Sequence, residues 1–366
     1  MKSNYVQQLT WLRGFAAFLV IISHTLQATK VDYTGENSEQ SFSFLSWLNL
    51  GSFGVVLFFA LSGCTLFISN ENKISLLKLK KFYLKRFFRI WPAFFISLIF
   101  YMVFREIFQL MYIKPQGYWV EQQFLSNYTF VDIFEYITFS FNFNGTVGLF
   151  NNAYWSLPVE FQYYLFFPVM VFLLNKFGGW GVFYFAVAIY LLPRLNVFPE
   201  SSLSVFTLAY SFIGGVFIGW FYKRHPLFSI NLKLGTFAIL SCFVLVSLVE
   251  NSALKLPDYI FISNKWNWFS ILSLVTVFTT LFTPIKITYL SLVKFLSHYG
   301  LVSYSTYLYH NLILGILVLV IIEFGLKPSF ILSLTVLIIT FIVSYIVAFI
   351  SYQYIEKPSI EVGRKF

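Results

Sequence analysis

The sequence has little charge. Only 11% of its 366 residues are Asp, Glu, Lys or Arg, while 58% are hydrophobic. Soluble globular domains carry about 25% charged residues. A soluble protein with one large core is therefore excluded, and the composition predicts an all-α, polytopic membrane helix bundle.

Acidic residues are scarce. The chain has 15 Asp and Glu against 25 Lys and Arg, a formal net charge of +10. A basic excess can indicate nucleic-acid binding, but here the basic residues lie in short loops between apolar runs, which is the positive-inside pattern of membrane proteins. We therefore expect a lipid bilayer, and no nucleic acid, around this chain.

The sequence has only two cysteines and none of the common nucleotide-binding motifs. The two cysteines, Cys64 and Cys242, lie in apolar stretches, so we expect buried thiols and neither a disulfide nor a metal site. A P-loop, a Gly-rich dinucleotide turn and a Gly-x-Ser-x-Gly elbow are missing, which removes support for nucleotide hydrolysis and α/β-hydrolase chemistry.

Arg13 interrupts the first apolar run, so we expect that run to be retained and not cleaved as a signal peptide.

Long apolar runs dominate what is present. Ten are long enough to cross a bilayer: 9–28, 51–69, 90–111, 155–174, 179–193, 203–221, 232–250, 266–283, 301–322 and 330–352. The run 130–143 is too short and polar, and we expect it to be interfacial or re-entrant. Basic residues gather in alternate loops, which predicts that both termini are cytoplasmic.

The runs predict one membrane domain over residues 1–366. Its largest outer loop, 112–154, is rich in Tyr, Phe and Asn. Aromatic and amide side chains suit the faces and hydroxyls of sugars, and they suit a membrane interface equally well. The loop alone therefore does not decide between these two roles.

The first span carries two ionisable residues, Arg13 and His24. They are eleven residues apart, which places them on one helix face about 16 Å apart. A charge in hydrocarbon costs at least ~2.5 kcal/mol and usually marks function. Arg13 near the inner boundary can also snorkel to headgroups, and His24 can be a buried hydrogen-bonded residue, but a neutral imidazole near the outer boundary suits a general base.

Two arginines share a helix face at the start of the third span. Arg86 and Arg89 are three residues apart, and two guanidinium groups so placed can bind phosphates bidentately. Anchoring to anionic lipid explains the same pattern equally well.

A carboxylate enters the fourth span. Glu160 lies about 8 Å below the predicted outer boundary, at a depth similar to that of His24. It must be paired, protonated or facing water. A His24–Glu160 pair in which Glu160 orients His24 is one arrangement, and a structural buried Glu160 is the other.

The ninth span contains a hydroxyl-rich run that ends at His310, near mid-bilayer. Ser303 and Tyr304 suit interhelical hydrogen bonds, whereas the roles of Tyr307 and His310 stay open. The candidate site-lining residues are Trp155, Ser156, Tyr164, Tyr307 and His310.

Together these segments resemble the acyltransferase-3 family of integral-membrane O-acyltransferases. The resemblance covers most of the chain, and its elements follow one another in the family's order: Leu12-Arg13-Gly14 with His24, Gly54–Gly63, Arg86-x-x-Arg89-Ile90-x-Pro92, Trp155-Ser156-Leu157-x-Val159-Glu160 with Tyr164 and Pro168, Ser303-Tyr304-x-x-Tyr307-Leu308-x-His310, and Glu356-x-Pro358.

The resemblance implies transfer of an acyl group, commonly acetyl, from cytoplasmic acyl-CoA to a glycan hydroxyl at the outer face of a bacterial cytoplasmic membrane. It implies that Arg13 with His24, and Arg86 with Arg89, are needed for activity. Val56 stands where many relatives have an acidic residue, so we expect no polar role at that position. We also expect a stand-alone membrane domain without a fused esterase-like domain.

Position and resemblance lead to one hypothesis. Arg13, Arg86 and Arg89 bind the phosphates of acyl-CoA as a co-substrate, with no permanently bound cofactor. His24 and Glu160 act on a hydroxyl of a glycan or lipid-linked saccharide, either by general-base catalysis or through an acyl-histidine. The alternatives are a secondary transporter or exporter that uses His24 and Glu160 as a proton relay, and a non-catalytic membrane receptor.

Overall fold

The structure is a computed structural model that describes residues 7–30, 47, 49–70, 79–111, 118–124, 126–195, 203–251, 264–284, 291–327 and 329–366. Within these ranges the chain is helical and forms no strand. The longer helices are α1 (Gln7–Lys30), α3 (Gly51–Asn70), α4 (Leu79–Met111), α8 (Ser156–Phe177), α9 (Gly179–Leu191), α10 (Leu203–Arg224), α11 (Leu232–Glu250), α12 (Lys265–Phe282), α13 (Ser291–Leu301), α14 (Ser303–Glu323) and α15 (Phe330–Ser351).

Eight helical stretches are long and apolar enough to cross a membrane: Gln7–Thr29, Gly51–Asn70, Leu79–Leu110, Asn152–Phe177, Val205–Arg224, Leu232–Glu250, Ser303–Glu323 and Phe330–Lys365. Each corresponds to one of the ten predicted spans, so the all-α polytopic bundle is confirmed. The other two predicted spans are also helical, as α9 and α12. The count of ten and the cytoplasmic termini stay predictions.

Helix α12 is not among these eight stretches and has a polar buried face. Its buried face carries hydroxyl residues at helical spacing, including Ser270, Ser273 and Thr276. Each donates to a carbonyl of the preceding turn, at 2.9, 2.8 and 2.7 Å. These hydroxyls are satisfied within their own helix, so the helix tolerates burial.

Contacts divide the chain into two compact units that interleave along the sequence. Unit 1 consists of Met1–Ala16, Ser52–Tyr83 and Val159–Leu301, and unit 2 of Ala17–Gly51, Leu84–Pro158 and Val302–Phe366. The prediction of a single domain is not tested by this division.

In unit 1, glycines bring helix backbones into direct contact. A Cβ on Gly63 of α3 would lie 2.2 Å from the carbonyl oxygen of Phe212 in α10, and one on Gly215 would lie 2.1 Å from that of Ala60. Such small-residue contacts are how membrane helices pack closely.

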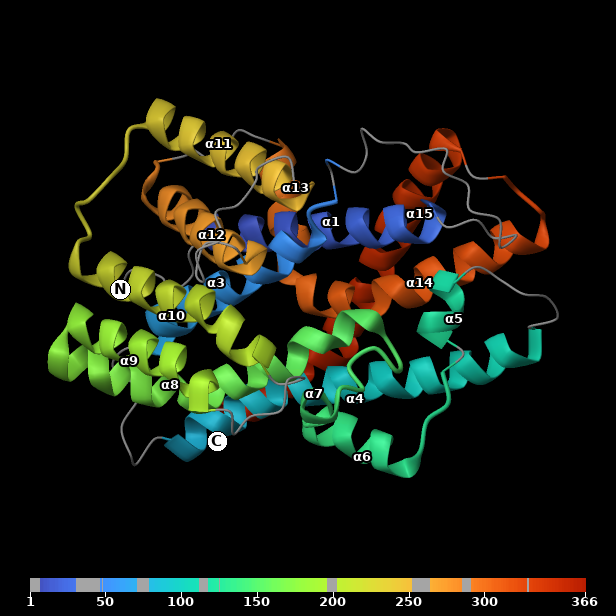
Figure 1. Ribbon diagram of the computed structural model, residues 1–366, viewed down its shortest axis with the longest axis horizontal. Coiled ribbons are helices and arrows are strands. Elements are labelled where there is room, and N and C mark those ends of the chain that lie inside the picture. Colours follow the sequence, from blue (N-terminus) through green and yellow to red (C-terminus); the bar gives the residue numbers. More distant parts are fainter. Residues whose placement is uncertain are drawn as a thin grey trace. The chain divides into compact units, whose positions relative to one another are not determined.

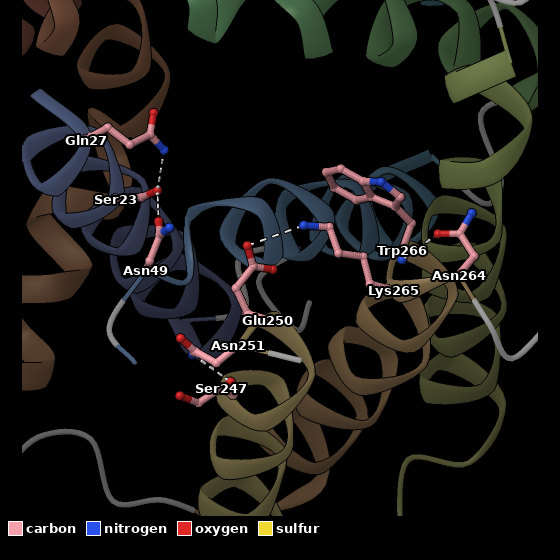
Figure 2. Close-up of polar contacts among 9 residues, drawn as sticks. All are labelled: Ser23, Gln27, Asn49, Ser247, Glu250, Asn251, Asn264, Lys265 and Trp266. Carbon is pink, nitrogen blue, oxygen red and sulfur yellow. Dashed lines mark hydrogen bonds and ion pairs between the residues drawn. The ribbon is translucent and has the colours of Figure 1, made fainter. Parts of the chain in front are cut away.

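An ion pair of 3.4 Å between Lys265 and Glu250 joins the start of α12 to the end of α11 (Figure 2).

In unit 2, α14 packs against α15 (orange and red in Figure 1). After α15 a single π-helical turn, η6 (Tyr352–Glu356), leads into α16 (Lys357–Lys365). Glu356 is buried and accepts a hydrogen bond of 2.9 Å from Ser305 of α14. This hydrogen bond attaches the π turn to α14. Single π-helical turns are frequent at functional sites.

The predicted interfacial piece, 130–143, forms two short helices of unit 2, α6 (Phe130–Thr138) and α7 (Phe141–Asn144). Phe130, Val131 and Phe134 are exposed on α6, while Glu135 and Tyr136 are buried. Burial raises the pKa of the Tyr136 hydroxyl, which donates to the carbonyl of Thr146 at 2.6 Å. The apolar exposed face and the short length suit a helix that lies at the membrane interface.

Candidate functional site

Arg13 and His24 lie on one unbroken helix, as predicted. Helix α1 contains no proline between Gln7 and Lys30. The eleven-residue separation therefore corresponds to a rise of about 16 Å along the axis. Both side chains are half-buried.

His24 contacts a second histidine. In unit 2 its Nδ1 lies 2.7 Å from Nε2 of His310, and the two ring planes differ by 4°. Nδ1 of His310 lies 3.1 Å from the carbonyl oxygen of Thr306 and 3.0 Å from that of Tyr307. His310 is fully buried, whereas His24 is partly accessible.

These contacts fix the position of each proton in the neutral pair. Carbonyl oxygens only accept, so Nδ1 of His310 carries its hydrogen and Nε2 of His310 is an acceptor. Nδ1 of His24 must then donate to it. The lone pair of His24 is left on Nε2, which makes Nε2 the nitrogen that can accept a proton or attack an electrophile.

A network of carboxamides lies beside the histidine pair. The side chain of Asn311 lies within interaction distance of the His24 ring, and its Oδ1 has no hydrogen-bond partner within the described residues. Its Nδ2 donates to Asn151 Oδ1 at 2.9 Å. Asn151 in turn accepts from the backbone N–H of Ala153 at 2.9 Å and donates to the carbonyl of Leu308 at 3.3 Å. The network therefore holds Asn311 Oδ1 in a fixed position.

Two of the predicted site-lining residues meet in the same unit. The hydroxyls of Ser156 and Tyr307 lie 2.8 Å apart, and Tyr307 also donates to the carbonyl of Ala153. Trp155 ends the short helix η2 (Asn152–Trp155) and is half-buried. These contacts attach the segment before α8 to α14, next to His310.

Further along α1, a hydrogen-bonded chain follows His24. Gln27 Nε2 donates to Ser23 Oγ at 3.2 Å, and Ser23 Oγ donates to Asn49 Oδ1 at 2.5 Å (Figure 2). Gln27 is exposed and lies one turn from His24 towards the C-terminal end of α1. The chain links the amides of Gln27 and Asn49 through Ser23, the residue before His24.

In unit 1, Arg13 and Glu160 bind neighbouring positions of α3. Arg13 Nη2 donates to Thr65 Oγ1 at 2.6 Å. Glu160 Oε1 accepts from Ser62 Oγ at 2.8 Å and from the hydroxyl of Tyr164. Ser62 and Thr65 are one helical turn apart, so one turn of α3 holds both charged residues.

A His24–Glu160 pair was one of the two arrangements predicted for Glu160. Within unit 2, His24 has a hydrogen bond to His310, and within unit 1, Glu160 accepts from two hydroxyls. The two residues belong to different units, so their pairing stays a prediction.

Helix α4 carries Arg86 and Arg89 in unit 2, both half-buried. They lie on one face, three residues apart, as predicted. The grouping of Arg13 with these two arginines stays a prediction because Arg13 belongs to unit 1.

A family model described as an acyltransferase domain matches residues 6–352. The chain belongs to the acyltransferase-3 family. It is also similar to the peptidoglycan O-acetyltransferase OatA of Listeria monocytogenes serovar 1/2a (strain ATCC BAA-679 / EGD-e), with 28% identity over 178 residues. That alignment covers 47% of this chain and 25% of the relative. No solved structure matches.

The family match and the apolar helices together make the chain an integral-membrane member of the acyltransferase-3 family. Four of the side chains that meet in unit 2 were predicted as site residues, namely His24, Ser156, Tyr307 and His310. Asn151 was expected only as one amide of the outer loop, and Asn311 was not predicted. The available signal was an amide directly after His310 in an apolar span, where an unsatisfied polar group is costly.

Proposed function

We propose that this acyltransferase is an O-acyltransferase that moves an acyl group, most simply acetyl, from acyl-CoA to a hydroxyl of a cell-surface or lipid-linked glycan. One observation carries the proposal: the hydrogen bond to His310 leaves Nε2 of a partly accessible histidine free to act as a base inside a membrane helix. The similarity to a peptidoglycan O-acetyltransferase supports a glycan acceptor.

In the direct route, Nε2 of His24 accepts the proton of the acceptor hydroxyl while the hydroxyl oxygen attacks the thioester carbonyl carbon. The new C–O bond forms and the C–S bond breaks. The imidazolium then returns the proton to the departing CoA sulfur. General-base assistance of this kind contributes roughly 10²–10⁴-fold.

In the covalent route, Nε2 itself attacks the thioester carbonyl carbon, so that a C–N bond forms, the C–S bond breaks and CoA leaves as the thiolate. The acceptor hydroxyl oxygen then attacks the acyl-histidine, the C–N bond breaks, and the hydroxyl proton passes to the CoA thiolate. Both routes need the lone pair on Nε2 and the proton on Nδ1. Rapid acid quenching of enzyme mixed with radiolabelled acetyl-CoA separates them, because only the covalent route leaves label on a peptide that contains His24.

The donor side of the proposal uses Arg13, Arg86 and Arg89 as phosphate ligands for cytoplasmic acyl-CoA. The acceptor side uses the C-terminal half of α1, with the amides of Gln27 and Asn49 near His24. In this arrangement the reaction crosses a bacterial cytoplasmic membrane from the inner to the outer face. The family assignment favours this reading over the exporter alternative.

A deletion strain complemented with variants tests the proposal. Mass spectrometry of surface glycans should show the acyl mass with the wild-type protein and with His298→Ala, since His298 is exposed on α13. The acyl mass should be lost with His24→Ala at equal protein levels. Wild-type acylation by His24→Ala would overturn the assignment.

A further inference from the structure

Two basic segments from distant parts of the chain come together in unit 2. Helix α16, which ends at the point marked C in Figure 1, lies against the start of α4. A Cβ on Gly363 would be 2.9 Å from Cβ of Phe88 and 3.5 Å from Cα of Lys85. The rings of Phe88 and Phe366 stack at 5.8 Å. The two segments are therefore packed against each other.

Tyr352 of the π turn lies near charged groups from both segments. Arg89 of α4 and Arg364 of α16 act electrostatically on its hydroxyl, together with Glu356 and Glu361. Arg86 lies one turn before Arg89 on the same face of α4. Arg89 and Arg364 thus both lie near Tyr352, where α16 packs against α4.

Two of these arginines have no carboxylate partner in the described part of the chain. No carboxylate oxygen there lies within 4 Å of the Arg89 or Arg364 guanidinium. Arg364 is followed by a second basic residue, Lys365, at the end of α16. An anion can therefore bind here by direct contact with arginine.

We propose that α16 is part of the donor site and that Arg364, with Arg86 and Arg89, binds the phosphate groups of the CoA nucleotide. The identity of the anion rests on the proposed function. CoA carries a diphosphate and a 3′-phosphate, and each can accept paired hydrogen bonds from a planar guanidinium group. Three arginines from two elements suit a ligand whose phosphates are several ångströms apart.

The position of the cluster suits a water-soluble nucleotide. Helix α4 has 33 residues, about 50 Å of helix, which exceeds the ~30 Å hydrocarbon core. Arg364 is exposed, and Arg86 and Arg89 are half-buried. The basic end therefore extends beyond the hydrocarbon, where a phosphate can reach the guanidinium groups while the acyl chain enters the bundle.

The same chemistry fits the phosphate of an anionic lipid headgroup, so the test must separate these sources. Purified protein in phosphatidylcholine nanodiscs, with and without phosphatidylglycerol, is titrated with CoA, dephospho-CoA and pantetheine. Arg364→Gln is compared with wild type and with Arg224→Gln. Arg224 is a matched control because it is also exposed at the end of a helix, α10.

We expect Arg364→Gln to weaken CoA binding at least tenfold, as loss of a charged hydrogen bond does. Pantetheine binding should be unchanged and Arg224→Gln should match wild type. Arg364→Lys, which keeps the charge but not the planar fork, should fall between the two and guards against a folding defect. A smaller loss for dephospho-CoA than for CoA would indicate that Arg364 contacts the 3′-phosphate.

Equal CoA affinity of Arg364→Gln and wild type would overturn the inference while leaving the proposed function intact. The same holds if the variant differs only in discs that contain phosphatidylglycerol, since that identifies a lipid contact. Failure of the wild-type protein to bind CoA at all would overturn the proposed function and this inference together.

Discussion

The side chain of Asn311 donates a 2.9 Å hydrogen bond to Asn151, and both residues are buried. The bond joins α14 to the segment that precedes α8. Asn311 also lies beside the His24 ring, and its Oδ1 has no hydrogen-bond partner within the described residues. We expect this oxygen to accept from Nε2–H when His24 becomes an imidazolium.

The first prediction concerns this acceptor. Asn311→Ala should lower turnover ten- to a hundredfold with an unchanged KM for acyl-CoA, because a preorganised acceptor for the imidazolium is lost. Its fold should lose only about 1–2 kcal/mol, since Asn151 keeps its bonds to Ala153 and Leu308. Steady-state kinetics and thermal unfolding in detergent measure both.

Asn151→Ala is the matched comparison. It removes both backbone contacts as well as the partner of Asn311, so it should lose stability as well as turnover. Equal turnover of Asn311→Ala and wild type would contradict the role of Oδ1.

The second prediction concerns the tautomers. The chain has only four histidines, so ¹⁵N-histidine spectra in nanodiscs can be assigned by single substitution. His24 should show a protonated Nδ1 and an unprotonated Nε2. His310→Ala should disturb this pattern and lower turnover, whereas His310→Gln supplies an amide oxygen that can accept from Nδ1–H and should restore part of both. A protonated Nε2 on His24 in the wild-type protein would disprove the assignment.

The third prediction separates structure from catalysis at Glu160. Glu160→Ala leaves the Ser62 and Tyr164 hydroxyls without their acceptor and should cost roughly 2–4 kcal/mol of stability. Glu160→Gln keeps an acceptor oxygen, so its unfolding temperature should stay near that of wild type. Ser62→Ala, with one bond removed, should cost about 1 kcal/mol. An equal loss of stability in Glu160→Ala and Glu160→Gln would contradict the hydrogen-bonding role.

The turnover of Glu160→Gln then reports on the carboxylate charge alone. A loss of tenfold or more at unchanged stability would support the orienting role predicted from the sequence. Wild-type turnover of Glu160→Gln would indicate that Glu160 has only a structural role, as the residue that hydrogen-bonds α3 to α8.

The fourth prediction concerns a close helix contact in unit 1. A Cβ on Gly300 would lie 1.9 Å from the carbonyl oxygen of Thr10, and one on Gly14 would lie 2.0 Å from that of Leu296. Gly300→Ala should therefore separate α13 from α1 and reduce the yield of folded protein. Gly148→Ala, whose nearest neighbour would be 3.9 Å away, is the control and should fold normally. Size-exclusion profiles in detergent compare the two.

Much of the helix pattern could be predicted because a span needs a long apolar run, and hydropathy detects such runs directly. The helical character of residues 266–283 was also predictable, although its polar face lowers the hydropathy of α12. The position of α16 was not predictable. Its contact with α4 depends on Gly363 and Phe88, residues far apart in the sequence that carry no shared pattern.

The candidate site was predicted in part for the same reason. His24 and His310 were recognisable singly, because an ionisable residue in an apolar run is costly. Their pairing depends on which faces of α1 and α14 meet, and helix periodicity within one span does not encode that. A contact between His24 and Glu160 stays a prediction, because residue counting gives height in the membrane but no lateral position.

The two carbonyls that hold His310 Nδ1 belong to the backbone of its own helix, one turn back at Thr306 and Tyr307. Any residue at those two positions supplies the same oxygens as long as α14 remains helical. Side-chain substitutions at Thr306 or Tyr307 that keep α14 helical therefore keep the hydrogen on His310 Nδ1 and the acceptor at its Nε2. The tautomer of His24 then depends on the backbone of α14 and not on the side chains at these two positions.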